Sequence, residues 1–96
     1  MDKSPCVYML ASAPNGTLYI GVTSNLPRRI ALHREGQVEG FSKRYGVTRL
    51  VWYEPHETME SAIVREKQMK KWNREWKARE IARRNPQWKD LTGEIG

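Results

Sequence analysis

Two short stretches near the start of the chain decide the fold: Val7-Tyr8-Met9 and Leu18-Tyr19-Ile20-Gly21. Each belongs to a longer run of alternating character, from Cys6 to Leu10 and from Thr17 to Val22, and such alternation is typical of β-strands. Between them, Pro14-Asn15-Gly16 has the composition of a turn. The sequence therefore predicts a β-hairpin with one tyrosine in each strand.

The register of this hairpin determines how the tyrosines lie. If residues 13–16 form the loop, Tyr8 lies opposite Gly21, and Tyr19 lies one step away diagonally on the same face. The two backbone positions are then roughly 7 Å apart, within reach of the rings. A two-residue loop separates the rings further. Since glycine has no side chain, we expect open space above Gly21. Tyrosine often serves only packing in strands, so the hairpin alone does not indicate a function.

Basic residues dominate the composition. The 96 residues carry 17 Lys+Arg and a formal net charge of +6. This favours a polyanionic partner, nucleic acid first, over a basic surface without a partner and over an acidic membrane. The length predicts a single domain over residues 1–96, with a core over about 5–91 and a mobile tail at 92–96. A single cysteine, Cys6, and the lack of a long apolar stretch favour a cytoplasmic location.

A helix with two inward-facing basic residues follows the hairpin. The segment Thr23-Ser24-Asn25 offers a cap, and the helix is expected to run to about residue 35. Leu26, Ile30 and His33 share an i, i+4, i+7 stripe, and Arg29 flanks it. A histidine on such a stripe is often a packed residue. However, an inward-facing cation is unfavourable without an anion, so the pair indicates that a phosphate binds there.

The rest of the chain predicts a third strand and a helical second half. Thr48 to Glu54 has strand character and ends at Pro55, after a polar loop over 37–47. Thr58 is a plausible helix cap, and Asn85-Pro86 ends the helical region. Four aromatic or apolar residues are expected to pack on the core. Trp72 and Trp76 are expected to pack from the basic helical region, and Trp88 and Leu91 are expected to attach the tail to the body.

Glu66 is the least expected residue in the chain. It lies in the middle of an otherwise apolar helical stripe. The stripe consists of Met59, Ala62, Ile63 and Met69. One explanation is an ion pair with a buried arginine such as Arg29. The other is a metal ligand, because Mg²⁺ prefers oxygen donors and often takes only one or two protein carboxylates.

Two basic segments are candidates for contacting phosphates. One is the polar loop, which mixes aromatic and basic residues, and the other is the strongly basic helical region. Both are also compatible with ordinary solvated surface. The candidate DNA-binding residues are Lys43, Arg44, Lys70, Lys71 and Arg74.

Taken together, these residues resemble the GIY-YIG nuclease superfamily. Leu18-Tyr19-Ile20-Gly21 matches the second half of its signature, whereas Val7-Tyr8-Met9 departs from the first half but keeps the tyrosine. Arg29 and His33 match the arginine and histidine of the family's helix, and Glu66 matches its metal-binding glutamate. The chain is most similar to small stand-alone bacterial members, which are described as endonucleases or as relatives of the N-terminal nuclease domain of the UvrC repair protein.

The resemblance implies an α/β fold of the α+β type: a small three-stranded antiparallel sheet flanked by helices, in the order β-β-α-β-α-α. It also implies metal-dependent hydrolysis of DNA phosphodiester bonds, with Mg²⁺ or Mn²⁺ held by Glu66. Tyr8 would act as the general base or as part of it, and Arg29 would hold the phosphate. Tyr19 and His33 would orient water and phosphate or share proton transfer.

The family also uses an asparagine late in the domain, and here Asn85 or Asn73 would correspond to it. Because the nuclease-like core uses the whole chain, cleavage of DNA is expected to be structure-directed, as on branched or damaged substrates, or weakly specific, or directed by a recruiting protein. Two other readings remain. One is a nucleic-acid-binding module with this fold and little or no catalysis, and the other is a basic scaffold in which Glu66 pairs with Arg29.

Overall fold

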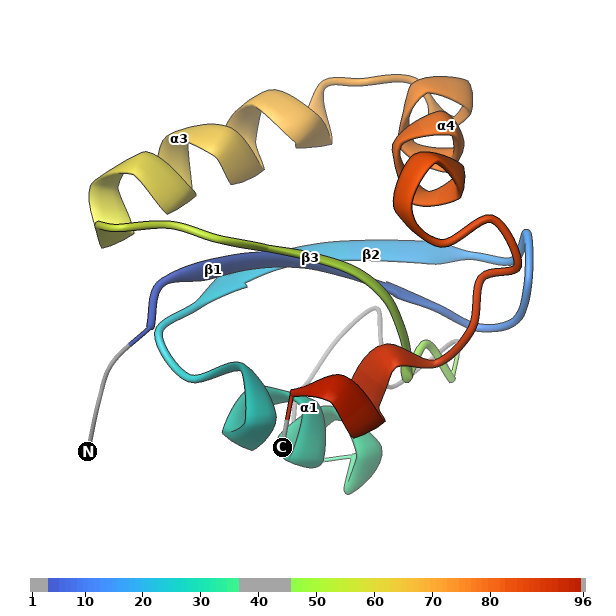
Figure 1. The fold of residues 1–96 in the computed structure, drawn as a ribbon, viewed down its shortest axis with the longest axis horizontal. Helices are drawn as coiled ribbons and strands as arrows, with labels where there is room; N and C mark the ends of the chain where they lie inside the picture. Colours follow the sequence, from blue (N-terminus) through green and yellow to red (C-terminus); the bar gives the residue numbers. More distant parts are fainter. Residues whose placement is uncertain (1–3, 37–45, 96) are drawn as a thin grey trace.

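The computed structural model describes residues 4–36 and 46–95 and has the predicted α+β architecture. Its elements, in chain order, are β1 (Cys6–Ala11), β2 (Leu18–Thr23), α1 (Leu26–Arg34), β3 (Arg49–Pro55), α3 (Met59–Lys70), α4 (Arg74–Arg84) and a short 3₁₀ helix, η1 (Leu91–Glu94) (Figure 1). Within the described ranges, no helix combines the length and the apolar character needed to cross a membrane.

The three strands form one antiparallel sheet in the order β2-β1-β3, so β2 is an edge strand. Tyr8 pairs with Gly21 and Leu10 with Tyr19, which is the register predicted for a loop over residues 13–16. The loop is closed by a 2.9 Å hydrogen bond from the Gly16 amide to the Ala13 carbonyl. The two tyrosines are therefore diagonal neighbours on one face of the sheet.

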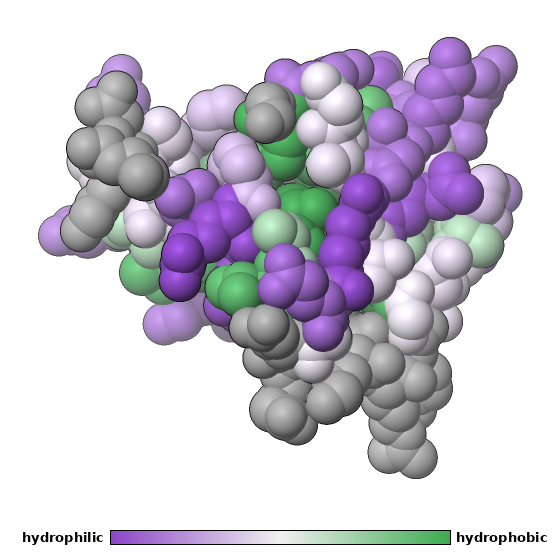
Figure 2. Space-filling model, turned by 90° about the horizontal axis from the view of Figure 1, so that it is seen from below, coloured by the Kyte–Doolittle hydropathy of each residue, from purple (hydrophilic) through white to green (hydrophobic). Residues whose placement is uncertain are grey.

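The sheet separates two apolar cores because side chains alternate along its strands. Helices α3 and α4 cover one face, and α1 covers the other (Figure 1). The core under α3 and α4 contains Val7, Met9, Ile20, Trp52, Ala62, Met69, Ile81 and Trp88. The core under α1 contains Cys6, Tyr8, Leu10, Leu26, Ile30, Val47 and Leu50. On the α1 side, hydrophobic residues are visible in the centre of the surface between hydrophilic ones (Figure 2).

Side-chain caps define the helix ends. The Asn25 side chain accepts a 3.2 Å hydrogen bond from the Arg28 amide and caps α1, and Thr58 accepts one of 3.1 Å from the Ser61 amide and caps α3. Both caps are as predicted. After α1, Gly36 has a φ of +70°, a left-handed conformation that favours glycine. The Asn25 cap and Gly36 thus define the two ends of the helix that carries Arg29 and His33.

The second half consists of two helices, α3 and α4, in agreement with the implied order, but the residue pattern did not locate the break between them. Trp72 lies in this break and packs partly against the core, whereas Trp76 lies in the first turn of α4 and is 52% exposed. The predicted i, i+4 docking of both tryptophans assumed one continuous helix, and it is wrong for Trp76. Ile63 is also 37% exposed, so the apolar stripe of α3 is narrower than its spacing suggested.

The C-terminal segment returns to the sheet. Trp88 is buried in the core under α4, and Leu91 packs against the core under α1, as predicted. Beyond them, η1 packs on β3, and the Tyr53 hydroxyl lies 3.2 Å from the Glu94 carboxylate. Ile95 also packs against the α1 core. Residues 91–95 thus lie against the sheet, and the mobility of the tail over 92–96 stays a prediction.

Candidate functional site

The hydroxyl of Tyr8 is the centre of a polar cluster inside the α1 core. Tyr8 itself is 0% exposed. Arg29 Nε donates a 3.3 Å hydrogen bond to the Tyr8 oxygen, and His33 Nε2 lies 3.0 Å from the same oxygen. A guanidinium group can only donate, so the phenol accepts from Arg29. In the tautomer of His33 with an unprotonated Nε2, the phenol donates its own proton to that nitrogen. This tautomer carries its ring proton on Nδ1.

Tyr19 supplies the third ring of the cluster. The Tyr19 ring centroid lies 6.2 Å from that of Tyr8 and 5.2 Å from that of His33, and the Tyr8 and His33 centroids are 5.9 Å apart. The structure thus brings together four of the predicted site residues, from β1, β2 and α1. We call Tyr8, Tyr19, Arg29 and His33 the tyrosine cluster.

Gly21 determines where the Tyr8 ring lies. A Cβ atom added at Gly21 would lie 2.5 Å from Cζ and from the hydroxyl oxygen of Tyr8, far inside contact distance. The expectation of open space above Gly21 is therefore wrong, because the ring of Tyr8 fills it. Since β2 is the edge strand, the ring carries the Tyr8 hydroxyl from central β1 across to the edge of the sheet.

Burial favours the neutral forms of Tyr8 and His33. Desolvation raises the pKa of Tyr8 to about 12, although the hydrogen bond from Arg29 acts in the opposite direction. Desolvation and the charge of Arg29 both lower the pKa of His33. The hydrogen bond to Tyr8 raises the pKa of Arg29 further. At neutral pH the cluster consequently contains a phenol and an imidazole that can accept its proton, beside one permanent positive charge.

Glu66 reaches the sheet from the other side. It lies on α3 between the buried Ala62 and Met69, and its side chain is only 12% exposed. Its carboxylate forms a 2.9 Å ion pair with Lys70, whose side chain is 56% exposed. The partner proposed from the sequence, Arg29, instead donates to Tyr8. The reason is topological, since α1 and α3 cover opposite faces of the sheet (Figure 1).

The donor set in the described part of the chain limits the kind of metal site. No group of three or more His, Cys, Asp and Glu side chains there could hold an ion. Glu66 offers one oxygen-donor carboxylate, and its ion-pair partner within residues 4–36 and 46–95 is an exposed lysine that a cation could displace. This fits a hard ion such as Mg²⁺, which completes its shell with water and substrate phosphate. It does not fit a resident ion enclosed by protein ligands.

Both candidate asparagines are used by the fold. The Asn85 amide nitrogen donates to the carbonyls of Val51 at 3.1 Å and Lys89 at 2.8 Å, and its oxygen accepts from the Lys89 amide at 3.0 Å. Asn85 is 5% exposed and lies at the end of α4, on the face of the sheet opposite the tyrosine cluster. Asn73 caps α4 by accepting from the Trp76 amide at 2.9 Å.

The predicted DNA-binding residues fall into three groups. Lys43 and Arg44 lie outside the described residues. Lys70 and Lys71 are exposed at the end of α3. The Arg74 guanidinium instead donates to the carbonyls of Asn15 and Gly16, each at 2.7 Å, and so ties α4 to the hairpin turn.

Sequence reasoning missed a charged cluster on β3. Glu54 accepts from His56 Nε2 at 2.8 Å and from Arg65 Nε at 3.1 Å, and Arg84 lies 3.7 Å away. Glu54 gave only a weak signal in the sequence, since it occupies an ordinary alternating position next to Pro55. The cluster connects β3 to α3 and α4, so it supports the layer that carries Glu66.

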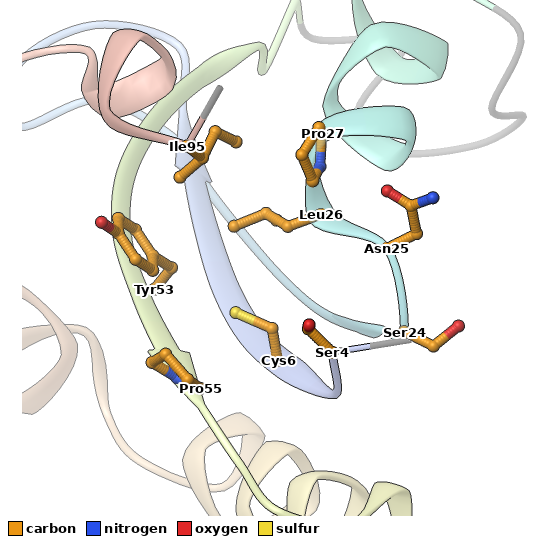
Figure 3. A pocket seen from close by; sticks show the side chains of 9 residues that line it. All are labelled: Ser4, Cys6, Ser24, Asn25, Leu26, Pro27, Tyr53, Pro55 and Ile95. Atoms are coloured by element: carbon orange, nitrogen blue, oxygen red, sulfur yellow. The ribbon is translucent and has the colours of Figure 1, made fainter. Parts of the chain in front are cut away.

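A cavity on the α1 side is separate from the tyrosine cluster. Its volume is about 330 Å³, and Leu26 of α1, Tyr53 of β3 and Ile95 surround it (Figure 3). It adjoins the first turn of α1, whereas His33 lies in the last turn. Cys6 also lines it, and burial raises the pKa of this thiol to about 11, so the thiol is neutral.

Comparisons with known proteins place the chain among related sequences. The sequence profile described as the GIY-YIG catalytic domain matches residues 4–80. UPF0213 proteins from Staphylococcus aureus strains Mu3, Mu50 and N315 are each 31% identical to the chain over 75 residues, which is 78% of this chain and 92% of theirs. No solved structure gave a significant match.

Proposed function

Since the chain belongs to the GIY-YIG catalytic-domain family, whose activity is of the nuclease type, we propose that it is a metal-dependent endonuclease that hydrolyses DNA phosphodiester bonds. The observation that carries this proposal is the arrangement around one oxygen. The Tyr8 hydroxyl accepts from Arg29 at 3.3 Å and lies 3.0 Å from His33 Nε2. A buried phenol held between a cation and a neutral base is suited to moving a proton.

The raised pKa of Tyr8 decides how that proton moves. A pKa of about 12 means that hardly any phenolate exists at neutral pH. Tyr8 therefore acts as a relay: its oxygen takes a proton from the attacking water while its own proton passes to His33 Nε2. The water oxygen then bonds to phosphorus and the bond to the leaving oxygen breaks. The leaving oxygen takes up a proton from solvent, and His33 holds the proton of the attacking water until it returns that proton to solvent. The lowered pKa of His33 keeps it ready to accept.

Arg29 holds the phosphate in this proposal. Its Nε donates to Tyr8 and it also interacts with Tyr19, so the remaining N–H groups of the guanidinium can donate to phosphate oxygens. In the described part of the chain its hydrogen-bond partners are phenols, which do not neutralise its charge. Tyr19, whose ring packs edge-on against His33, orients the water or the phosphate.

Glu66 supplies the ligand for a divalent ion, Mg²⁺ or Mn²⁺. When bound, such an ion stabilises charge on the scissile phosphate and the leaving oxygen. Two observations support the proposal that Glu66 and the tyrosine cluster act on the same phosphate at the free edge of β2. The Tyr8 ring crosses Gly21 of β2, and α3, which carries Glu66, packs on β2 and β1 from the other face. Exposed Lys70 and Lys71 at the end of α3 then contact the flanking phosphates.

The experiment is a nicking and cleavage assay on plasmid and branched DNA with Mg²⁺ or Mn²⁺. Arg29→Ala and Glu66→Ala are expected to lower the rate by about 10²- to 10³-fold, the usual effect of removing one electrostatic stabiliser. Arg28→Ala and Glu60→Ala are matched controls, because they remove the same charges from exposed positions of the same helices. Both controls should cleave at nearly the wild-type rate.

The competing proposal is a nucleic-acid-binding module with little or no catalysis. The ion pair between Glu66 and Lys70 favours it, because it gives the carboxylate a purely structural use. If wild type and Glu66→Ala give the same cleavage and both still bind DNA, the nuclease proposal is wrong and the binding module remains.

A further inference from the structure

Trp76 is a large aromatic residue with no place in the core. It is 52% exposed. Its ring meets that of Trp72 edge to face, with centroids 6.3 Å apart. Trp72 packs in turn against the core under α3 and α4. The Trp76 ring is thus supported from behind by a fixed neighbour while much of its own surface faces solvent.

The ring borders a hollow with a basic wall. The hollow has a volume of about 210 Å³ and is lined by Trp72, Trp76, Arg79, Glu80 and Arg83. Glu80 pairs with Arg83 at 2.6 Å and accepts from the Trp52 indole at 3.1 Å, so together with Arg79 these charged side chains leave the hollow with a net positive charge. Arg79 is exposed, and the Arg83 side chain is 60% exposed. We call Trp76, Arg79 and Arg83 the α4 platform.

The charges select among possible occupants of this platform. A second copy of the chain would bring further arginines against Arg79 and Arg83, and the net charge of +6 already opposes self-association. A purely apolar partner would have to desolvate these guanidinium groups. A nucleotide fits both features, since its base has an aromatic face and its phosphate is anionic.

We propose that the α4 platform binds an unpaired nucleotide, with its base stacked on Trp76 and its backbone phosphate held by Arg79 and Arg83. In a duplex both faces of each base are covered by neighbouring base pairs, so only a single-stranded segment can use the ring. This deepens the proposed nuclease function, on which it rests for the nature of the polymer. It assigns the enzyme a preference for DNA with a single-stranded segment beside the cleaved strand.

The test separates binding from cleavage. Fluorescence anisotropy of a labelled oligothymidylate, and of a labelled duplex of equal length, is measured in EDTA so that metal-dependent cleavage does not contribute. Trp76→Ala is expected to weaken single-strand binding about tenfold, within the range for losing one stacked base, and duplex binding less than about twofold. Trp76→Phe, which keeps a ring, should stay within about threefold of wild type for both.

Matched controls identify the residue type that matters. Ile63→Ala removes an exposed apolar side chain from α3, and Lys67→Ala removes one exposed charge, so neither should reproduce the selective effect of Trp76→Ala. Thermal unfolding confirms that Trp76→Ala is folded. The inference is overturned if wild type and Trp76→Ala bind the single strand with equal affinity, or if Trp76→Ala loses affinity equally for both DNAs. It is also overturned if Trp76→Ala loses self-association and keeps its DNA affinity. If the nuclease proposal fails, wild type and Glu66→Ala cleave DNA at the same rate with and without added metal. The binding result for Trp76→Ala is then unaffected.

Discussion

Replacing Gly21 with alanine adds a single methyl group at the point where β2 supports the tyrosine cluster. The new Cβ would lie 2.5 Å from two atoms of the Tyr8 ring, whereas carbon atoms in contact are about 3.5–4.0 Å apart. The ring must therefore move by about 1 Å, or β2 must move away from it. Neither is easy, because Tyr8 is 0% exposed and hydrogen-bonded to Arg29 and His33.

The magnitude follows from these contacts. Overpacking a core costs about 1–3 kcal/mol, and weakening a buried hydrogen bond adds about 1 kcal/mol. We expect Gly21→Ala to lower the free energy of unfolding by about 2–4 kcal/mol, which lowers Tm by about 10–25 °C in a domain of this size. Displacing the Tyr8 hydroxyl by about 1 Å should also lower the cleavage rate about 10²-fold.

Calorimetry or thermal unfolding, together with the cleavage assay, measures both effects. Gly93→Ala is the matched control, because nothing lies within 4 Å of a Cβ there and its backbone is not left-handed. Its stability should stay within about 0.5 kcal/mol of wild type. A Gly21→Ala protein with the stability and rate of wild type would refute the placement of the Tyr8 ring over Gly21.

Two further predictions concern Asn85 and His33. Asn85→Ala should lower the free energy of unfolding by about 2–4 kcal/mol through the loss of three hydrogen bonds, as measured by urea unfolding, while the folded protein cleaves DNA at about the wild-type rate. A stable variant with a large loss of rate would instead make Asn85 catalytic. Because burial and Arg29 lower the pKa of His33 from 6.5, protonation of His33 disfavours folding, so stability should fall as the pH drops below 6.5. The cleavage rate should also begin to fall on the acid side only below pH 6.5. His33→Gln should lack this pH dependence of stability. A cleavage rate that already falls above pH 6.5 would contradict this role of His33.

Alternation and turn chemistry were enough to predict the hairpin, but they left two registers open. The pairing of Tyr8 with Gly21 followed from a loop over residues 13–16, and the position of His33 followed from the 3.6-residue period of α1. These features depend on local rules, and local rules are visible in a sequence. The convergence of Tyr8, Arg29 and His33 followed because α1 lies directly after β2.

The features that could not be predicted depend on how distant segments pack. The filled space over Gly21 depends on the rotamer of Tyr8, and the ion pair of Glu66 with Lys70 depends on which face α3 covers. The exposure of Trp76 depends on where the chain breaks between α3 and α4. Asn85 looked available because its partners, such as the Val51 carbonyl, are distant in the chain.

The central claim is that the Tyr8 hydroxyl relays the proton from the attacking water to His33. The most direct measurement is the single-turnover cleavage rate of Tyr8→Phe, which removes only that oxygen. Tyr53→Phe is the matched control, because it removes a strand tyrosine hydroxyl that contacts Glu94 near the C-terminal end. The account predicts a rate lowered by about 10²- to 10⁴-fold for Tyr8→Phe, with DNA affinity and the Tyr53→Phe rate nearly unchanged. A Tyr8→Phe protein that cleaves DNA at the wild-type rate would contradict it.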